Sequence, residues 1–277
     1  MFAPDTTIEL GDVTLAVDDR GAARRAAGAT PLVLIHGFTG GRIDFTDVID
    51  DLATDSRVVV WDHRGHSDST NTGDLASYTF DSLVGDAWQA VDALGLDRFH
   101  LLGHSMGGVV AQRLVLEHPE RIASLILMDT LAEPALSIPE EWIDKFTTMG
   151  REQGMARVAE VMADFGAGQM VAPEDERPRI LERNRHKLTN MDPEAFRGLA
   201  TALRTFEPLL DALPEVACTT TVIVGEHDVP LRGQAEAIAA AIPGAELVVI
   251  DGAAHCPQEE RRDAWLAAVQ GHLARCD

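Results

Sequence analysis

Residues 98–108 read RFHLLGHSMGG, and this stretch decides which fold we expect. An apolar run leads directly into Gly103-His104-Ser105-Met106-Gly107, which fits the pattern G-x-S-x-G, and a helix-like segment over 106–117 follows. In a turn this tight, glycines two positions on either side of the serine remove side chains that would clash. The turn holds the serine in a strained conformation with its hydroxyl exposed. The pattern favours Ser105 as a nucleophile over the alternative, a strand–helix joint whose glycines only relieve crowding.

Strand-like and helix-like segments alternate on both sides of this turn. Strand-like apolar runs occur at residues 32–35, 57–62, 98–103, 122–129, 220–225 and 246–251, and several lack alternation, as strands buried on both faces do. Helix-like segments occur at residues 43–53, 79–94, 106–117, 232–241 and 258–274. Two short alternating segments, 6–10 and 13–17, are joined by Gly11-Asp12, which predicts a hairpin. The alternation predicts an α/β fold in which helices cover a mostly parallel sheet.

The alternation stops between residues 131 and 213, where no strand-like run occurs and short amphipathic segments carry many charges. A stretch of about 80 residues is far longer than an ordinary loop. We therefore expect a core domain formed by residues 1–130 and 214–277, and a helical cap formed by residues 131–213.

Composition excludes several classes of protein. With 277 residues, 45% of them hydrophobic and 25% charged, the chain can bury a core, and wholesale disorder is excluded. The net charge of −22 argues against nucleic acid as a partner, because a polyanion needs Lys and Arg to neutralise it. No apolar run reaches the roughly 18 residues that cross a bilayer, so we expect no membrane span.

The cysteines and the N-terminus indicate the compartment. Cys218, Cys256 and Cys276 are odd in number and widely separated, which argues against a disulfide framework. The N-terminal residues, MFAPDTTIEL, have neither a basic start nor an apolar segment, so no secretory signal is visible. We therefore expect a cytoplasmic protein, either a monomer or a homodimer, that acts on a small molecule.

A serine hydroxyl is a poor nucleophile until a base takes its proton, and the base is commonly a histidine oriented by an acid. His255 follows the last strand-like run, and Asp228 follows the run before it. The carboxyl ends of parallel strands meet at one edge of a sheet, so Ser105, Asp228 and His255 are the predicted catalytic residues. Asp129, which ends the run 122–129, and Glu226 are rival candidates for the acid.

Acyl transfer also needs hydrogen-bond donors for the developing oxyanion. The backbone N–H of Met106, directly after the nucleophile, is one candidate. The second is expected in the loop after the run 32–35, which reads His36-Gly37-Phe38-Thr39-Gly40-Gly41, and we favour the N–H of Phe38. We expect His36 to be a structural, hydrogen-bonded histidine.

The chain resembles the α/β-hydrolase superfamily. The matching elements, in family order, are HGFTGG (36–41), WDHRGHSDS (61–69), GHSMGG (103–108), GEHDVP (225–230) and GAAHCPQEE (252–260). The resemblance implies an eight-stranded, mostly parallel sheet with a helical cap after the sixth strand, and a serine hydrolase without a cofactor. It also implies that the second element is a structural loop. Asp62, His63 and His66 are therefore not expected to bind a metal ion, because no further ligand pattern accompanies them.

Within this superfamily the sequence leaves the subfamily open. A serine at position 105 disfavours dehalogenases and epoxide hydrolases, whose members use aspartate there. Cys256 stands where carbon–carbon bond hydrolases of ring-cleavage products carry tryptophan, and Val109 where menaquinone-pathway synthase-like lyases carry arginine. A carboxylic ester or lactone hydrolase needs neither residue and is the first interpretation, with those two classes as alternatives. A ligand receptor without catalysis is the alternative of another class.

The predicted cap should determine the substrate. Flexible methionines and flat aromatic rings can line an adaptable apolar pocket, and Phe146, Phe165 and Met162 are the residues we select. The alternative is that they form the core of the cap. The basic run Arg177, Arg179, Arg183, Arg185, His186 and Lys187 alternates with acidic residues, which favours a solvated helix face over a carboxylate-binding site. Cys256 is expected to be a packing residue.

Overall fold

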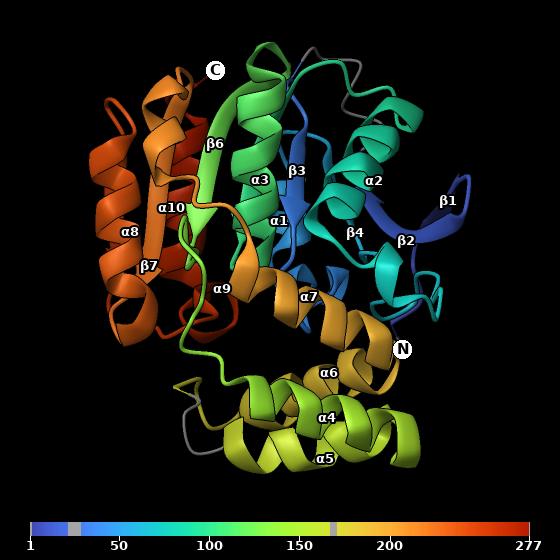
Figure 1. Ribbon diagram of the computed structural model, residues 1–277. Helices are drawn as coiled ribbons and strands as arrows, with labels where there is room; N and C mark the ends of the chain where they lie inside the picture. The colour runs from blue at the N-terminus through green and yellow to red at the C-terminus, as the bar shows by residue number, and fades with distance from the viewer. Residues whose placement is uncertain (1, 22–28, 167–170, 277) are drawn as a thin grey trace.

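The structure, a computed structural model, describes residues 2–21, 29–166 and 171–276, with residues 164–166 described by their backbone alone. Its centre is one eight-stranded sheet (Figure 1). The strands are β1 (Thr6–Leu10), β2 (Val13–Arg20), β3 (Leu32–Ile35), β4 (Val58–Trp61), β5 (Phe99–His104), β6 (Ile122–Met128), β7 (Thr219–Gly225) and β8 (Glu246–Ile250). Their order in the sheet is β1-β2-β4-β3-β5-β6-β7-β8.

Antiparallel pairing is confined to the edge of the sheet that carries the hairpin. β1 pairs with β2, and β2 with β4, in antiparallel register, whereas β3 to β8 form parallel pairs throughout. Every residue of β3, β4 and β5 is buried, because helices cover both faces of the sheet. The α/β fold with a mostly parallel sheet, predicted from the alternating runs, is confirmed.

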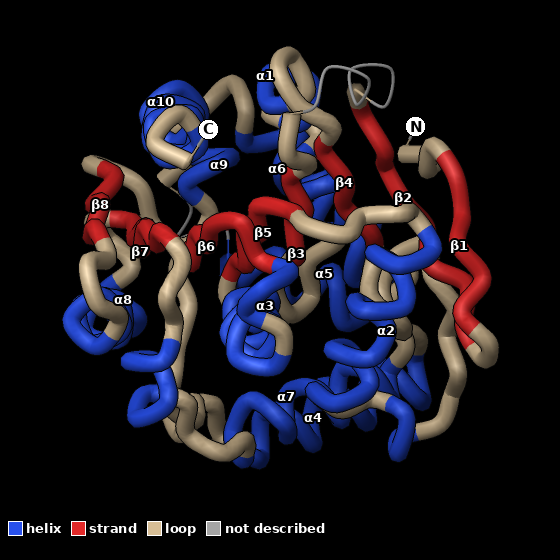
Figure 2. Tube along the Cα trace, turned by 90° about the horizontal axis from the view of Figure 1, so that it is seen from above, coloured by secondary structure: helices blue, strands red, loops and turns tan. Residues whose placement is uncertain are grey.

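Two layers of helices flank the sheet. On one face lie α2 (Phe80–Ala93), α3 (Met106–Glu117) and α8 (Val229–Ala241), and on the other lie α1 (Ile49–Leu52), α9 (Pro257–Glu260) and α10 (Arg262–Leu273) (Figure 2). Each face has its own apolar core, and Trp265 of α10 is fully buried in the second. Within the described residues, no helix is long and apolar enough to span a membrane.

Two predicted helices are interrupted. The segment 43–53 forms a 3-10 turn, Arg42–Phe45, followed by the short α1, because Asp44 accepts a hydrogen bond from the Gly41 N–H (3.0 Å) and tightens the first turn. The closing helix divides into α9 and α10 at Arg261, whose backbone dihedrals (φ −141°, ψ 55°) are not helical.

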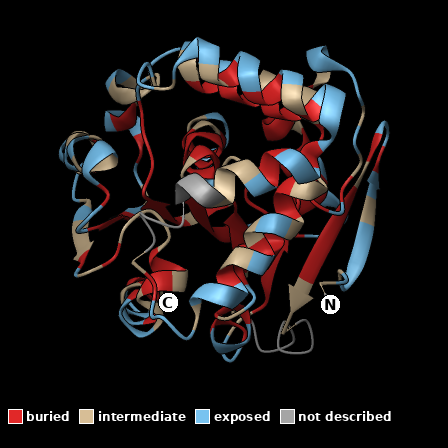
Figure 3. Cartoon of the chain, turned by 90° about the horizontal axis from the view of Figure 1, so that it is seen from below, coloured by how far each residue is buried: buried red, intermediate tan, exposed pale blue. Residues whose placement is uncertain are grey.

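Among the described residues between β6 and β7, in the interval where the sequence predicts the cap, there are four α-helices. They are α4 (Glu140–Gln153), α5 (Met155–Gly166), α6 (Arg177–Thr189) and α7 (Pro193–Thr205), and they lie below the sheet in Figure 1. α4 packs against α5 and α7, and α5 packs against α6. Their inward sides are buried and their outer sides exposed (Figure 3), as amphipathic helices should be.

Helix α6 corrects one prediction. Arg177, Arg179 and Arg185 are exposed, but Arg183 and Lys187 are buried, so the expected solvated face is wrong for these two side chains. Arg183 pairs with Asp47 and with Glu259 (2.7 Å), and Lys187 pairs with Asp44. All three acids belong to the sheet domain. The two cations are buried because α6 faces that domain, where each finds the opposite charge that a buried ion requires.

A buried histidine makes the stability of this fold sensitive to acid. His272 of α10 is fully buried, with its Nε2 2.7 Å from Ser124 Oγ and its Nδ1 2.8 Å from Thr221 Oγ1. Burial, reinforced by the charge of Arg275, lowers the pKa of His272 to about 4. In the unfolded chain the imidazole has its ordinary pKa near 6.5. The unfolded state therefore binds the additional proton between these values, and stability is lost as the pH falls through this range.

We predict that the H272Q variant loses less unfolding free energy than the native protein when the pH falls from 7 to 4.5. Glutamine retains hydrogen-bonding groups but does not titrate, so it removes one source of acid sensitivity. Urea unfolding at several pH values measures the effect, and exposed His118, as H118Q, is the control. Parallel curves for the native protein and H272Q would contradict the prediction.

Candidate active site

Ser105 lies in the turn between β5 and α3 and has the strained backbone that the sequence predicts, with φ +54° and ψ −121°. The two glycines are needed for close packing. A Cβ atom at Gly103 would lie 2.4 Å from the Gly107 carbonyl oxygen, and one at Gly107 would lie 2.4 Å from the Ile35 carbonyl oxygen. The backbone N–H of Ser105 donates to the Met128 carbonyl (2.9 Å), which ties the turn to β6.

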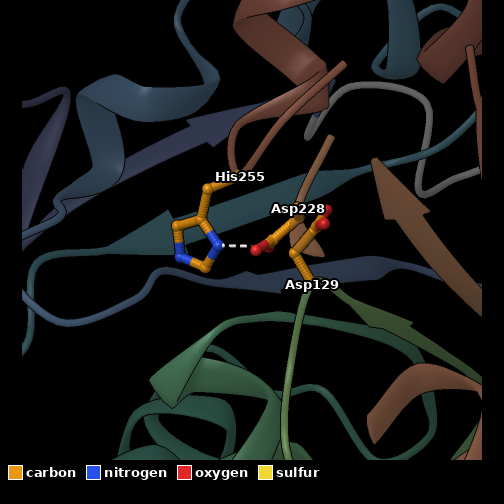
Figure 4. A group of neighbouring side chains, drawn as sticks. All are labelled: Asp129, Asp228 and His255. Atoms are coloured by element: carbon orange, nitrogen blue, oxygen red, sulfur yellow. Dashed lines mark hydrogen bonds and ion pairs between the residues drawn. The ribbon is translucent and has the colours of Figure 1, made fainter. Parts of the chain in front are cut away.

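The structure brings the three predicted catalytic side chains together. His255 Nε2 lies 3.1 Å from Ser105 Oγ, and His255 Nδ1 lies 2.7 Å from Asp228 Oδ2 (Figure 4). Asp228 follows β7 and His255 follows β8, so all three come from the carboxyl ends of parallel strands. The arrangement requires an Nδ1–H that donates to Asp228, which leaves Nε2 free to accept the serine proton.

Of the three candidate acids, Asp228 is the one that contacts the imidazole. Burial disfavours the charge of Asp228, but the hydrogen bond and the electrostatic attraction between Asp228 and His255 oppose this effect, and the Asp228 pKa is lowered. Glu226 is exposed and accepts from the Gly252 N–H (2.8 Å). Asp129 is buried beside Asp228, where its Oδ1 accepts from the Gly225 N–H (2.8 Å). An ionised Asp228 is suited to orient His255 and to stabilise its charged form.

The loop after β3 lies against the serine. A Cβ atom at Gly37 would lie 2.8 Å from the Cβ of Ser105, so only glycine allows this approach. The next residues turn sharply, with the Gly40 N–H donating to the Gly37 carbonyl (3.0 Å) and Thr39 at φ +58°. Phe38 thus stands at the rim of the site. Met106 is the first residue of α3, and its N–H has no partner within the helix.

Two buried histidines support the site. His36 is hydrogen-bonded as expected for a structural residue: its Nδ1 lies 2.8 Å from the Gly37 carbonyl, and its Nε2 accepts from the His63 N–H (3.0 Å). His104 donates from Nε2 to the His255 carbonyl (2.7 Å), which fixes the loop that carries the base. Burial lowers the pKa of His104 to about 4, so the ring stays neutral. The sequence pattern did not identify His104 as a residue that supports the site, although it directly precedes Ser105.

A cavity of about 540 Å³ lies over Ser105 and His255. Its apolar wall consists of residues from the loop after β3 and from helices α5, α6 and α8, namely Phe38, Ala159, Met162, Ala163, Ile180, Leu181, Leu188 and Pro230. Met162 therefore lies where the sequence places it. Phe146 does not line the cavity but packs against Trp142 of α4 and Phe196 of α7 (ring centroids 4.9 and 6.3 Å apart). The Phe165 side chain lies outside the described residues.

Charged and thiol groups also line this cavity. Asp44, Lys187, Glu259 and Glu260 contribute to its wall, and Cys256 lies beside His255. Burial raises the pKa of the Cys256 thiol well above its ordinary value, and the neighbouring Glu259 adds to this shift. The thiol thus stays protonated and unreactive, which fits a packing residue better than a second nucleophile.

Two groups of side chains have the composition of a metal site. One oxygen each of Asp129 and Asp228 and a ring nitrogen of His255 lie within 4.8 Å of one another, but Asp228 and His255 direct these atoms at each other. In the 61–69 loop, Asp62 accepts from the Arg42 N–H (2.7 Å), and burial lowers the pKa of His63 to about 3. Asp228 and His255 in the first group, and Asp62 in the second, are thus engaged in hydrogen bonds within the chain.

The chain is similar to known proteins over almost its whole length. The enol-lactonase from Burkholderia xenovorans LB400 has a TM-score of 0.82 and 25% identity, covering 97% of this chain and 100% of that one. A thermophilic esterase from Thermogutta terrifontis has a TM-score of 0.81 and 29% identity, covering 98% and 97%. The 2-hydroxymuconate semialdehyde hydrolase of Pseudomonas sp. (strain CF600) is 27% identical over 100% of this chain and 98% of its own length.

The match covers a smaller part of the length of other curated relatives: 65%, 39% and 44% of the length of three of them. A model of the family described as the alpha/beta hydrolase fold matches residues 30–262, which is most of the chain. The match includes the loop after β3, the serine turn, and the loops that carry Asp228 and His255. The chain therefore belongs to the alpha/beta hydrolase fold family.

Proposed function

We propose that the protein is a serine hydrolase that cleaves a carboxylic ester or lactone of a small, largely apolar substrate through an acyl-enzyme. The observation that carries this proposal is the unbroken chain of hydrogen bonds from Asp228 through His255 to Ser105, which ends in a cavity. Similarity to an enol-lactonase and an esterase over almost the whole chain supports the same class of reaction.

Acylation follows from the positions of the atoms. Ser105 Oγ attacks the acyl carbonyl while His255 Nε2 takes the hydroxyl proton, and Asp228 stabilises the imidazolium that forms. The backbone N–H groups of Phe38 and Met106 bind the negative charge that develops on the carbonyl oxygen. The imidazolium then protonates the leaving alcohol, or, in a lactone, the ring oxygen that remains attached.

Deacylation repeats these roles with water as the nucleophile. His255 removes a proton from a water molecule, which attacks the acyl carbon, and the collapse of the second tetrahedral intermediate returns the proton to Ser105. Serine, histidine and water carry every proton and bond change in this scheme, so it requires neither a cofactor nor a metal ion.

The walls of the cavity favour a neutral acyl group. The only buried cation among its described lining residues, Lys187, already pairs with Asp44, while Glu259 and Glu260 add negative charge. A carboxylate-bearing substrate would meet these acids, and the other cation of the wall, Arg185, is exposed to water, which screens its attraction for an anion. The apolar residues of α5 and α6 offer a compatible surface for an alkyl or aryl group.

A carbon–carbon bond hydrolase of ring-cleavage products is the second candidate, and the full-length similarity to a 2-hydroxymuconate semialdehyde hydrolase favours it. The two candidates share the serine turn and differ in the bond that the substrate presents. An assay panel with an ester, a lactone, a thioester and a vinylogous diketone separates them. Stoichiometric labelling by a fluorophosphonate without turnover of any panel member would instead indicate a ligand receptor.

We predict that S105A lowers the kcat for a short nitrophenyl ester by about 10⁴ or more, because it removes the nucleophile. Labelling by a fluorophosphonate probe should be stoichiometric in the native protein and absent in S105A. The control is S137A, at an exposed serine of the loop between β6 and α4. This variant should hydrolyse the ester, and be labelled by the probe, at native rates. Full ester turnover by S105A would remove the serine from the mechanism.

We predict that M162W narrows the range of acyl chains. Met162 lines the cavity from α5, and a larger, rigid indole at this position should occupy the space that a longer chain needs. The kcat/KM for a hexanoate ester should fall about 10-fold, whereas the value for the acetate ester should stay within about 3-fold of native. The acetate ester is the internal control, and equal losses for both esters would show that Met162 does not limit chain length.

A further inference from the structure

The scheme above leaves one buried acid without a role. Asp129 follows β6 directly, is fully buried, and has a left-handed backbone conformation (φ +42°) that is uncommon for aspartate. Its N–H donates to the Ile223 carbonyl (2.9 Å), which fixes its backbone beside β7. Figure 4 shows its carboxyl group next to that of Asp228, which in turn points toward His255.

The two oxygens of Asp129 are unequally satisfied. Oδ1 accepts from the Gly225 N–H at 2.8 Å. Oδ2 is buried and, among the residues that the structure describes, has no hydrogen-bond partner. One oxygen of Asp129 and one of Asp228 lie within 4.8 Å of each other. Two carboxylates this close in a buried site do not both carry a charge, so one of the two groups holds a proton.

The surroundings determine which group is protonated. Asp228 meets the Nδ1–H of His255, which favours its charged form. Asp129 lies deeper, and burial raises its pKa well above the ordinary value. The hydrogen bond from the Gly225 N–H opposes this shift, whereas the negative charges of Asp228 and Glu260 add to it. The proton therefore resides on Asp129, and an O–H toward Asp228 satisfies the oxygen that otherwise has no partner.

We propose that Asp129 is a positioning residue, whose protonated carboxyl group donates a hydrogen bond to Asp228 and holds that carboxylate in the orientation in which it meets His255 Nδ1. The inference rests on the proposed function, since it assigns Asp129 to the same serine, histidine and aspartate. It also explains why an acid at this position does not orient the imidazole itself: one of its oxygens is held by Gly225, and the other faces Asp228.

The test compares D129N with D129L. Asparagine keeps an acceptor for the Gly225 N–H and supplies an N–H for Asp228, whereas leucine has a similar size and supplies neither. We expect D129N to react with a fluorophosphonate probe within about 3-fold of the native rate, and D129L to react about 10- to 100-fold more slowly, with kcat reduced and KM for the ester unchanged. D228N, measured in parallel, should lose activity whichever residue stands at position 129.

A direct measurement covers the case in which D129L does not fold. The carboxyl carbon of Asp129, assigned in the native protein by its loss in D129N, should have the ¹³C chemical shift of a protonated acid at pH 7. An ionised Asp129 at this pH would overturn the proposal. So would a D129N variant as inactive as D228N, or a folded D129L variant that is labelled at the native rate.

These outcomes are separable from a failure of the proposed function. The carboxyl shift and the labelling rate do not depend on which bond the natural substrate presents, so they test Asp129 even if no ester is turned over. Turnover by S105A would refute the proposed hydrolysis, and it would leave the protonation of Asp129 to be decided by the spectrum.

Discussion

The site depends on a close backbone contact between two neighbouring strands. The turn after β5 can reach the loop after β3 only because Gly37 and Gly107 lack side chains, whose Cβ atoms would overlap Ser105 and the Ile35 carbonyl. This contact holds Ser105 in a left-handed conformation that serine otherwise avoids. Strand β5 before the turn and helix α3 after it offset the energetic cost of this strain. The Ser105 hydroxyl is thereby exposed at the edge of the sheet.

Because parallel strands end at one edge, the same geometry collects the other two members of the site. β7 and β8 lie beyond β6, and the loops that follow them bring Asp228 and His255 to the serine. Two hydrogen bonds of buried polar groups fix these loops. His104 donates to the His255 carbonyl, and the Gly225 N–H donates to the Asp129 carboxyl group. The imidazole of His104 donates in the first contact and the carboxyl group of Asp129 accepts in the second, so both contacts satisfy polar groups that are removed from water.

The helices between β6 and β7 meet the sheet domain through paired charges as well as apolar contacts. Lys187 and Arg183 of α6 reach Asp44 and Glu259, whose side chains belong to the domain that carries the catalytic residues. Buried ion pairs of this kind specify how two surfaces meet more than they stabilise the contact, because desolvation offsets most of their attraction. The pair with Asp44 also occupies Lys187, a buried cation of the cavity wall that could otherwise receive an anionic substrate.

The sequence by itself determined the α/β fold, the strand–turn–helix at Ser105 and the choice of Asp228 and His255, because local spacing and the order of strands carry that information. Only the tertiary structure decided which side chains face one another. It placed Phe146 between helices α4 and α7, turned Arg183 and Lys187 inward, and set Asp129 against Asp228. The periodicity of a sequence can identify the faces of a helix or the end of a strand. Which residues pack against each face depends on segments far away in the chain. The burial and the charge pairing of a side chain are therefore decided by tertiary contacts.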